Sequence, residues 1–366
     1  MIAYPVKIVH NSKVNKKYHS LPCTNTMRAV RKLKPGPGHI ALCNIPEPDI
    51  EHPDDIKIAV QRGGLCGTDL HIRHGGYGIR PPVTLCHELS GEVVKVGTSV
   101  TRIKTGDRIT VLPTASGACG HCRYCRASEF FFCPQRKSVG SMRDGGFAEY
   151  CIIPQNLAFP LPESVSYDTA ALVEPLACCI KAVLFHTKIA PGDLVLVSGP
   201  GPIGLICADL ARLAGGRVIV CGTDRDAHRL AMAKSAEHTV DVTRKNISEF
   251  VRALNRDGAD IVIECAGAAA SIDQCLDAVR PLGTFTQVAL IEHPVEVNWG
   301  KIIYKQLSVH SSIAQNWPSW QRALEMIIAK TIDPSAYISH RLPLENWEQA
   351  FDGAERQEGL KYVLYP

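Results

Sequence analysis

An apolar strand, a glycine-rich turn and a helix follow one another at residues 194–216, and this segment constrains the fold more than any other. It is LVLVSGPGPIGLICADLARLAGG, in which Gly199, Gly201 and Gly204 have the spacing G-x-G-x-x-G. The first glycine permits a tight turn, the second lets a pyrophosphate approach the backbone, and the third lets the helix pack on the strand. The helix N-terminus adds partial positive charge. The segment therefore predicts a parallel α/β fold with a dinucleotide bound at this turn.

An acidic residue ends the next apolar strand, where such folds hold the ribose. This residue is Asp224, 20 positions after Gly204. A carboxylate there accepts hydrogen bonds from the ribose hydroxyls and repels a 2′-phosphate, which favours NAD. The neighbouring Arg225 could neutralise a 2′-phosphate, so NADP stays open as an alternative. A glycine-rich turn without any ligand is the other alternative, and the strand before the turn and the helix after it argue against it.

Four further residues are expected near the cofactor. Ile203 lies inside the glycine motif and should pack near the dinucleotide. Arg229 follows Asp224 by five residues and could approach the adenosine end, although a solvated helix charge is an equal interpretation. Val288 and Leu290 end a later apolar strand and are expected to line the nicotinamide pocket.

The chain changes its pattern along its length. Residues 27–110 contain short β-branched runs broken by Gly and Pro, such as DDIKIAVQRGG, which is typical of a small β-barrel or sandwich. Residues 177–312 alternate apolar strands with Ala- and Leu-rich helical patterns, which predicts a parallel sheet covered by helices. Residues 313–366 contain two helical patterns and a last short strand.

Charge and hydropathy exclude two classes of partner. The formal net charge of +4 over 366 residues is weak and dispersed, and no basic stripe with interleaved aromatics indicates nucleic acid. No apolar run approaches the roughly 18 residues that cross a bilayer. Residues 1–26 carry lysines and no acidic residue, but their apolar part is short, interrupted by Pro5 and Lys7, and lacks a small-residue cleavage site. We expect an N-terminal extension there and a cytoplasmic location.

Four of the fifteen cysteines are clustered, which in a cytoplasmic chain indicates metal binding rather than disulfides. Their spacing is C-x2-C-x2-C-x7-C, and they are Cys119, Cys122, Cys125 and Cys133. Four thiolates around one ion suit tetrahedral structural zinc. An iron–sulfur cluster is the main competitor, because similar short spacings hold such clusters.

A second set of ligand-type residues is dispersed along the chain. Cys66 lies in GLCGTDLH, His87 and Glu88 lie in LCHELSGEVVKVG, and Glu174 lies in ALVEPLACC. Taken singly, His87 is more often a hydrogen-bonded structural histidine, and Glu174 is more often a surface carboxylate. Spacing alone does not bring these residues together.

Six motifs occur in an order that resembles a known family. They are CGTDLH, HELSGEVVKVG, the four-cysteine segment, GGFAEY, EPL and GPGPIG. From about Met27 to the C-terminus, the chain resembles the zinc-containing medium-chain dehydrogenase/reductase family. The EPL motif at Glu174 resembles the sorbitol (polyol) and threonine dehydrogenase branches.

The resemblance implies a fold and a division into domains. Residues 27–176 and 313–366 would form a GroES-like β-barrel catalytic domain, with a structural-zinc lobe at about 115–135. A Rossmann-fold, NAD-binding domain of residues 177–312 would be inserted into it, making the whole an α/β protein. Relatives of this branch are homotetramers or dimers, so a homo-oligomer is implied.

The resemblance also implies roles for the dispersed ligands. Cys66, His87 and Glu88 would bind a catalytic zinc, and Glu174 would be a fourth ligand or hold a zinc-bound water. Which of Glu88 and Glu174 binds the metal directly stays open. The four clustered cysteines would hold a structural zinc.

Two more residues are implied to move a proton, and one departs from the family pattern. Thr68 resembles the hydroxyl relay of the family, and His71 could pass the proton to water, because an imidazole titrates near neutral pH. A turn residue and a surface histidine are the plain alternatives. Cys86 stands where the family has glycine, and we expect this thiol to pack as a small hydrophobic group.

Together these features predict a zinc-dependent oxidoreductase that transfers a hydride from a secondary alcohol of a polyol-like molecule to NAD. L-threonine 3-dehydrogenase and an NADP-using alcohol dehydrogenase are the alternatives within the enzyme class. A binding protein that has lost its catalytic metal is the alternative outside it, and the intact set Cys66, His87 and Glu174 argues against that.

Overall fold

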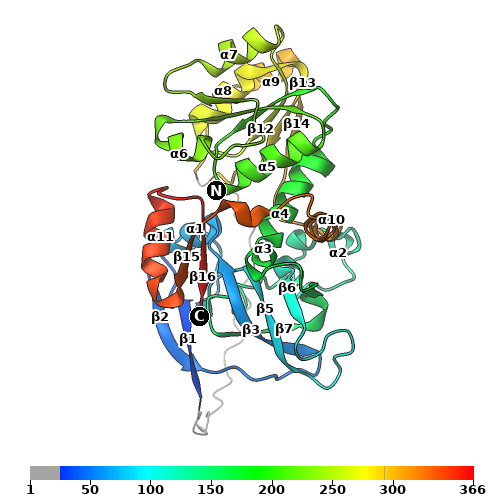
Figure 1. The fold of residues 1–366 in the computed structure, drawn as a ribbon, viewed down its shortest axis with the longest axis vertical. Coiled ribbons are helices and arrows are strands. Elements are labelled where there is room, and N and C mark those ends of the chain that lie inside the picture. The colour runs from blue at the N-terminus through cyan, green and yellow to red at the C-terminus, as the bar shows by residue number, and fades with distance from the viewer. Residues whose placement is uncertain (1–24, 292) are drawn as a thin grey trace.

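The computed structural model describes residues 25–291 and 293–366, and it divides into two parts stacked along the long axis of the molecule (Figure 1). The lower part contains the N-terminal strands and the C-terminal strand, and the upper part contains the middle of the chain. The extension of residues 1–26 falls almost wholly outside the described residues, and the first strand begins at Thr26.

The lower part is built on a seven-stranded sheet of order β15-β16-β3-β5-β6-β8, with β7 paired to β3. Alternate residues of β7 are buried, because one face of the strand packs on the core. A three-stranded sheet of order β2-β1-β4 lies beside it. The strands are β1 (Thr26–Lys32), β2 (Ile40–Pro46), β3 (Asp55–Gly64), β4 (Val83–Thr84), β5 (Glu88–Val96), β6 (Arg108–Val111), β7 (Tyr150–Pro154), β8 (Ala158–Pro160), β15 (Ile338–Pro343) and β16 (Lys361–Tyr365).

The C-terminal strand returns to the first sheet. Val363 and Leu364 of β16 pair antiparallel with Gly64 and Gly63 of β3. The middle of the chain is therefore inserted between two segments that fold together, as the sequence predicts. The numerical domain bounds given above stay a prediction.

The upper part contains a six-stranded parallel sheet of order β11-β10-β9-β12-β13-β14. In chain order within this part the arrangement is 3-2-1-4-5-6, which is the Rossmann order. All five residues of β9 are buried, because helices cover both faces. The strands are β9 (Leu194–Ser198), β10 (Arg217–Gly222), β11 (His238–Asp241), β12 (Ala259–Glu264), β13 (Val279–Gln287) and β14 (Ser308–Ser311).

The two faces of this sheet bury different sets of helices. Residues of α4, α5 and α10 share one core with Val195 and Val197, and residues of α7 and α8 share another with Leu194 and Leu196. Helices α4 and α10 pack on each other near the junction of the two parts (Figure 1). The helices are α1 (Gly67–His74), α2 (Arg123–Arg126), α3 (Tyr167–Ala171), α4 (Val173–Ile180), α5 (Pro202–Leu213), α6 (Ala227–Leu230), α7 (Ile247–Leu254), α8 (Ala269–Ala278), α9 (Trp299–Lys305), α10 (Trp317–Ile328) and α11 (Trp347–Glu355), and a π-helix (Lys181–His186) continues α4.

Within the described ranges, none of the helices combines the length and the apolar composition that a membrane crossing requires.

Candidate active site and metal centres

A cavity of about 300 Å³ is lined by residues from both parts of the molecule. One wall carries Cys66, Thr68, His71, His87 and Glu174, and another carries Ile203, Cys265, Val288 and Leu290. The second wall lies at the carboxyl ends of β9, β12 and β13, next to the point where the strand order of the parallel sheet reverses. Open α/β sheets bind their ligands at this position.

The dispersed ligand residues meet at one end of this cavity. Ligand atoms of Cys66, His87 and Glu88 all lie within 4.8 Å of one another. Cys66 is the N-cap of α1, while His87 immediately precedes β5 and Glu88 begins it. Glu174, in the first turn of α4, lines the same cavity but lies outside this close group. The tertiary fold thus brings Cys66 close to His87 and Glu88, which their spacing in the sequence does not predict.

The carboxylate of Glu88 has one oxygen that is used and one that is not. Lys361 Nζ donates to Glu88 Oε1 at 2.6 Å, and both side chains are buried. Oε2 is buried and accepts no hydrogen bond within the described part of the chain. An unpartnered buried carboxylate oxygen is costly unless a cation or a donor meets it. A thiolate, an imidazole and this free oxygen form a donor set that zinc accepts.

Negative charge is concentrated around this group. Burial alone would lower the pKa of His87, but the charges of Cys66, Glu174 and Asp69 outweigh it and raise that pKa well above its ordinary value. Burial raises the pKa of Glu174 to about 7. The residues present therefore fit a bound cation.

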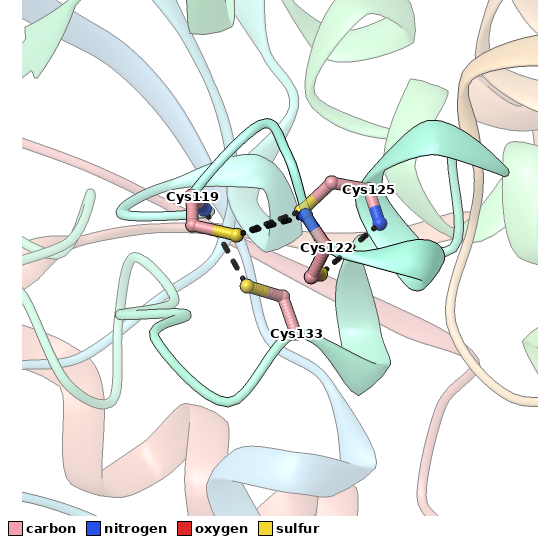
Figure 2. A group of neighbouring side chains, drawn as sticks. All are labelled: Cys119, Cys122, Cys125 and Cys133. Atoms are coloured by element: carbon pink, nitrogen blue, oxygen red, sulfur yellow. Dashed lines mark hydrogen bonds between the residues drawn. The ribbon is translucent and has the colours of Figure 1, made fainter.

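The four clustered cysteines surround a single point, as Figure 2 shows. Their sulfur atoms all lie within 4.8 Å of one another, and Cys119 Sγ is 3.9 Å from Cys125 Sγ. Tetrahedral zinc with zinc–sulfur bonds of about 2.3 Å requires sulfur separations of about 3.8 Å. The cage has the size for one ion, which favours zinc over an iron–sulfur cluster.

Backbone N–H groups orient the sulfurs within this lobe. The amides of Cys122 and Cys125 donate to the sulfurs of Cys119 and Cys122, each at 3.4 Å. Backbone N–H groups of His121 and Cys122 lower the pKa of Cys119 to about 6, which favours its thiolate. The local turns therefore prepare the site before any metal binds.

The glycines of the cofactor turn are required by its shape. Gly199 has φ of 91°, and a side chain there would approach the backbone nitrogen of Ala266 to 2.7 Å. A side chain at Gly204 would collide with the carbonyl oxygen of Gly199. Gly201 is the N-cap of α5, and open space surrounds the place of its missing side chain. The turn leaves room for a phosphate at the helix N-terminus.

The other predicted cofactor residues divide into two groups. Ile203, Val288 and Leu290 line the cavity, and Asp224 is exposed directly after β10. Arg229 is only 8% exposed, and its guanidinium donates to the carbonyl oxygen of Gly359 at 2.7 Å. That contact holds the C-terminal segment against the upper part, and an adenosine contact of Arg229 stays a prediction.

Thr68 and His71 both line the cavity on α1. Thr68 Oγ1 lies 3.7 Å from Cys66 Sγ, beside the ligand group. Cys86 has φ of 79°, in the region that favours glycine, and its fully buried thiol donates to the carbonyl oxygen of Glu88 at 3.3 Å. This placement supports the expected packing role of Cys86.

Sequence reasoning missed two groups around the cavity. Lys361 pairs with Glu88 from the other end of the chain, and the only signal was a lysine opening the short apolar strand YVLY. Arg136 and Thr114 line the cavity from the segments that flank the four-cysteine lobe. In the sequence, the only signal for this group was the positive charge of Arg136, three residues after Cys133.

Comparisons with known proteins identify the class. Residues 52–163 match the alcohol dehydrogenase GroES-like domain, and residues 202–329 match the zinc-binding dehydrogenase family. The sorbitol dehydrogenase of Halalkalibacterium halodurans is 39% identical over 93% of this chain and 99% of its own length. The D-arabitol-phosphate dehydrogenase of Enterococcus avium is 34% identical over 93% and 98%.

A solved structure agrees with these relatives. A Sinorhizobium meliloti protein described as a zinc-binding dehydrogenase, bound to NADP, superposes with a TM-score of 0.86 at 33% identity, over 93% of this chain and all of the other. The chain belongs to the zinc-containing medium-chain dehydrogenase/reductase family, in its polyol and threonine dehydrogenase branch. It is an NAD(P)- and zinc-dependent oxidoreductase, and the predicted family and fold are confirmed.

Proposed function

We propose that this enzyme oxidises a secondary alcohol of a polyol-like substrate and transfers the hydride to NAD. One observation carries the proposal: Cys66 and His87, with Glu88 beside them, lie at one wall of a cavity whose other wall adjoins the glycine-rich turn. The cavity thus has room for a small alcohol between a cation site and a nicotinamide site.

The protein groups divide the work. Cys66, His87 and Glu88 or Glu174 would hold zinc, which supplies a Lewis acid that makes an alcohol proton easier to remove. Thr68 would accept that proton and His71 would pass it toward solvent. Lys361 fixes the Glu88 carboxylate through its ion pair. Ile203 and Val288 would exclude water from the hydride path.

Asp224 supports NAD as the preferred cofactor, because its exposed carboxylate would bind ribose hydroxyls and repel a 2′-phosphate. Arg225 is exposed beside it, and the Sinorhizobium meliloti relative binds NADP, so NADP is the second candidate.

A homo-oligomer, dimer or tetramer, would cover an exposed edge of the parallel sheet. The edge strand β14 is exposed along its whole length, and large apolar side chains lie exposed on it and on α9 nearby. They include Val309 at 46%, Ile303 at 68% and Tyr304 at 92% exposure. An exposed strand edge with apolar neighbours is suited to pairing with a second copy.

A cytoplasmic location agrees with the thiols. Every cysteine between residues 25 and 366 is free, and free thiols persist in a reducing compartment.

Initial rates with NAD and NADP over sorbitol, other polyols, L-threonine and simple alcohols test the proposal. We expect polyols to give the highest kcat/KM and two zinc ions per chain. Turnover of L-threonine without activity on polyols would replace the polyol assignment by L-threonine 3-dehydrogenase. One zinc per chain with no activity on any alcohol would favour a non-catalytic binding protein.

A further inference from the structure

One positively charged side chain at the cavity has no role in the reaction proposed above. Arg136 lines the cavity from the segment that follows the four-cysteine lobe. Ion pairs among residues 25–291 and 293–366 do not include it. The guanidinium has five N–H donors, and among the described residues it donates one hydrogen bond, to Ser138 Oγ at 3.1 Å. Most of its donors therefore remain available to a ligand.

Arg136 is held in place by its neighbours rather than left in solvent. Its guanidinium stacks on the ring of Phe131, with 4.2 Å from the guanidinium carbon to the ring centre. Its backbone N–H donates to the carbonyl oxygen of Cys133, the last ligand of the lobe. A stacked guanidinium with a fixed backbone loses little entropy when it binds a partner. The four-cysteine lobe thus holds the guanidinium of Arg136 in a fixed position at the cavity.

An unpartnered hydroxyl lines the same cavity. Thr114 is 7% exposed, and its Oγ1 is buried without a hydrogen-bond partner in the described chain. Ser138 and Ser141 line the cavity as well. A buried polar atom without a partner is costly, so a ligand that reaches Thr114 would remove that cost. The hydroxyl and the guanidinium together suit an oxygen-rich anion.

We propose that Arg136 and Thr114 form a subsite for an oxyanion on the substrate, and that the preferred substrates are polyols carrying a phosphate monoester. The subsite rests on the dehydrogenase function proposed above and narrows its substrate class. A carboxylate would use the same donors, since a guanidinium binds either group with paired N–H bonds.

Matched substrates separate these ligands. Rates are measured for the zinc-loaded full-length enzyme with sorbitol, sorbitol 6-phosphate and gluconate. We expect kcat/KM to be roughly 10- to 100-fold higher for the phosphate ester than for sorbitol. This is the gain that a charge-assisted hydrogen bond between the guanidinium and the phosphate would contribute. A gluconate preference that depends on Arg136 would keep the oxyanion subsite and overturn the assignment to phosphate.

Variants at Arg136 test the residue itself. Arg136→Gln should reduce the ratio of kcat/KM for sorbitol 6-phosphate over sorbitol by roughly 10-fold or more, and Arg136→Lys should restore part of it. Arg126→Gln is the control, because Arg126 is exposed in the same lobe and does not line the cavity. Inorganic phosphate should bind the wild-type enzyme in calorimetry more tightly than it binds Arg136→Gln.

Three results would overturn the subsite. They are equal turnover of sorbitol, sorbitol 6-phosphate and gluconate by the wild-type enzyme, unchanged ratios of charged over neutral substrate in Arg136→Gln, or a variant that changes only the KM of NAD. In each case polyol oxidation still stands. Failure to oxidise any polyol, charged or neutral, with either cofactor would instead refute the proposed function.

Discussion

The two metal-ligand clusters of this molecule are built in opposite ways. The four-cysteine lobe draws all its ligands from residues 119–133, and backbone amides of the same turns orient the sulfurs. The group of Cys66, His87 and Glu88 is assembled from separate segments, and Lys361 fixes its one carboxylate from the end of the chain. One site is thus prepared by local structure, while the other exists only when the whole lower sheet has formed.

The two clusters also differ in whether their ligands leave a coordination position open for a substrate. Four sulfurs fill a tetrahedral shell and leave no position for a substrate, whereas a thiolate, an imidazole and a carboxylate leave an open one. The open cluster lies on the cavity, while none of the four clustered cysteines lines it. Changes in the two clusters should therefore affect activity and stability in different proportions.

Loss of a ligand in the dispersed cluster should have the largest effect. Cys66→Ala removes the thiolate, and we expect kcat/KM to fall at least roughly 1,000-fold, because a catalytic metal contributes several kcal/mol to transition-state stabilisation. Zinc content should fall from two to one per chain, with an unchanged circular dichroism spectrum. Retention of both ions, or of most activity, would refute the role given to Cys66.

The buried ion pair should contribute the next largest effect. Lys361→Met leaves the Glu88 carboxylate buried without its partner, which should cost about 3–5 kcal/mol of folding free energy. Urea unfolding measures it, with Lys188→Met as the exposed control. Glu88→Gln added to Lys361→Met should recover part of the loss, since it removes the unpaired charge. An unfolding midpoint equal to wild type would show that the pair does not hold the dispersed cluster.

A ligand of the lobe should affect stability more than catalysis. Cys122→Ser should release one zinc and lower the free energy of unfolding by about 3 kcal/mol, as loss of a metal ligand typically does. The activity of the folded fraction should fall far less than in Cys66→Ala. Loss of activity equal to that of Cys66→Ala would contradict the separation of roles between the two clusters.

The smallest effect is expected at Asp224, the exposed carboxylate directly after β10 that we expect to bind the cofactor ribose. Asp224→Ala removes a charged acceptor for the ribose hydroxyls, and we expect the ratio of kcat/KM for NAD over NADP to fall roughly 10-fold. Initial rates with both cofactors measure this ratio, and Asp257→Ala, at an exposed residue, serves as the control. An unchanged ratio would indicate that other residues, such as Arg225, determine the preference between NAD and NADP.

The same contrast explains what the sequence could predict. The lobe and the glycine turn follow from spacing, because their residues are neighbours along the chain and turn geometry places them. Cys66, His87 and Glu174 were united only by resemblance to a family, since their meeting depends on the tertiary fold. The ion pair of Lys361 with Glu88 was missed for the same reason.

Arg229 shows that a local sequence pattern can also miss a residue's long-range partner. Its position five residues after Asp224 indicated the cofactor, but the returning C-terminal segment presents the carbonyl of Gly359 to its guanidinium. A local pattern cannot anticipate a partner that arrives from 130 residues further along the chain.

X-ray diffraction from crystals of the purified enzyme at the zinc absorption edge would examine both clusters at once. The account predicts two anomalous peaks, one inside the cage of four cysteine sulfurs and one beside Cys66 and His87. A single peak at the cage, with none beside Cys66 and His87 after zinc is supplied, would contradict it.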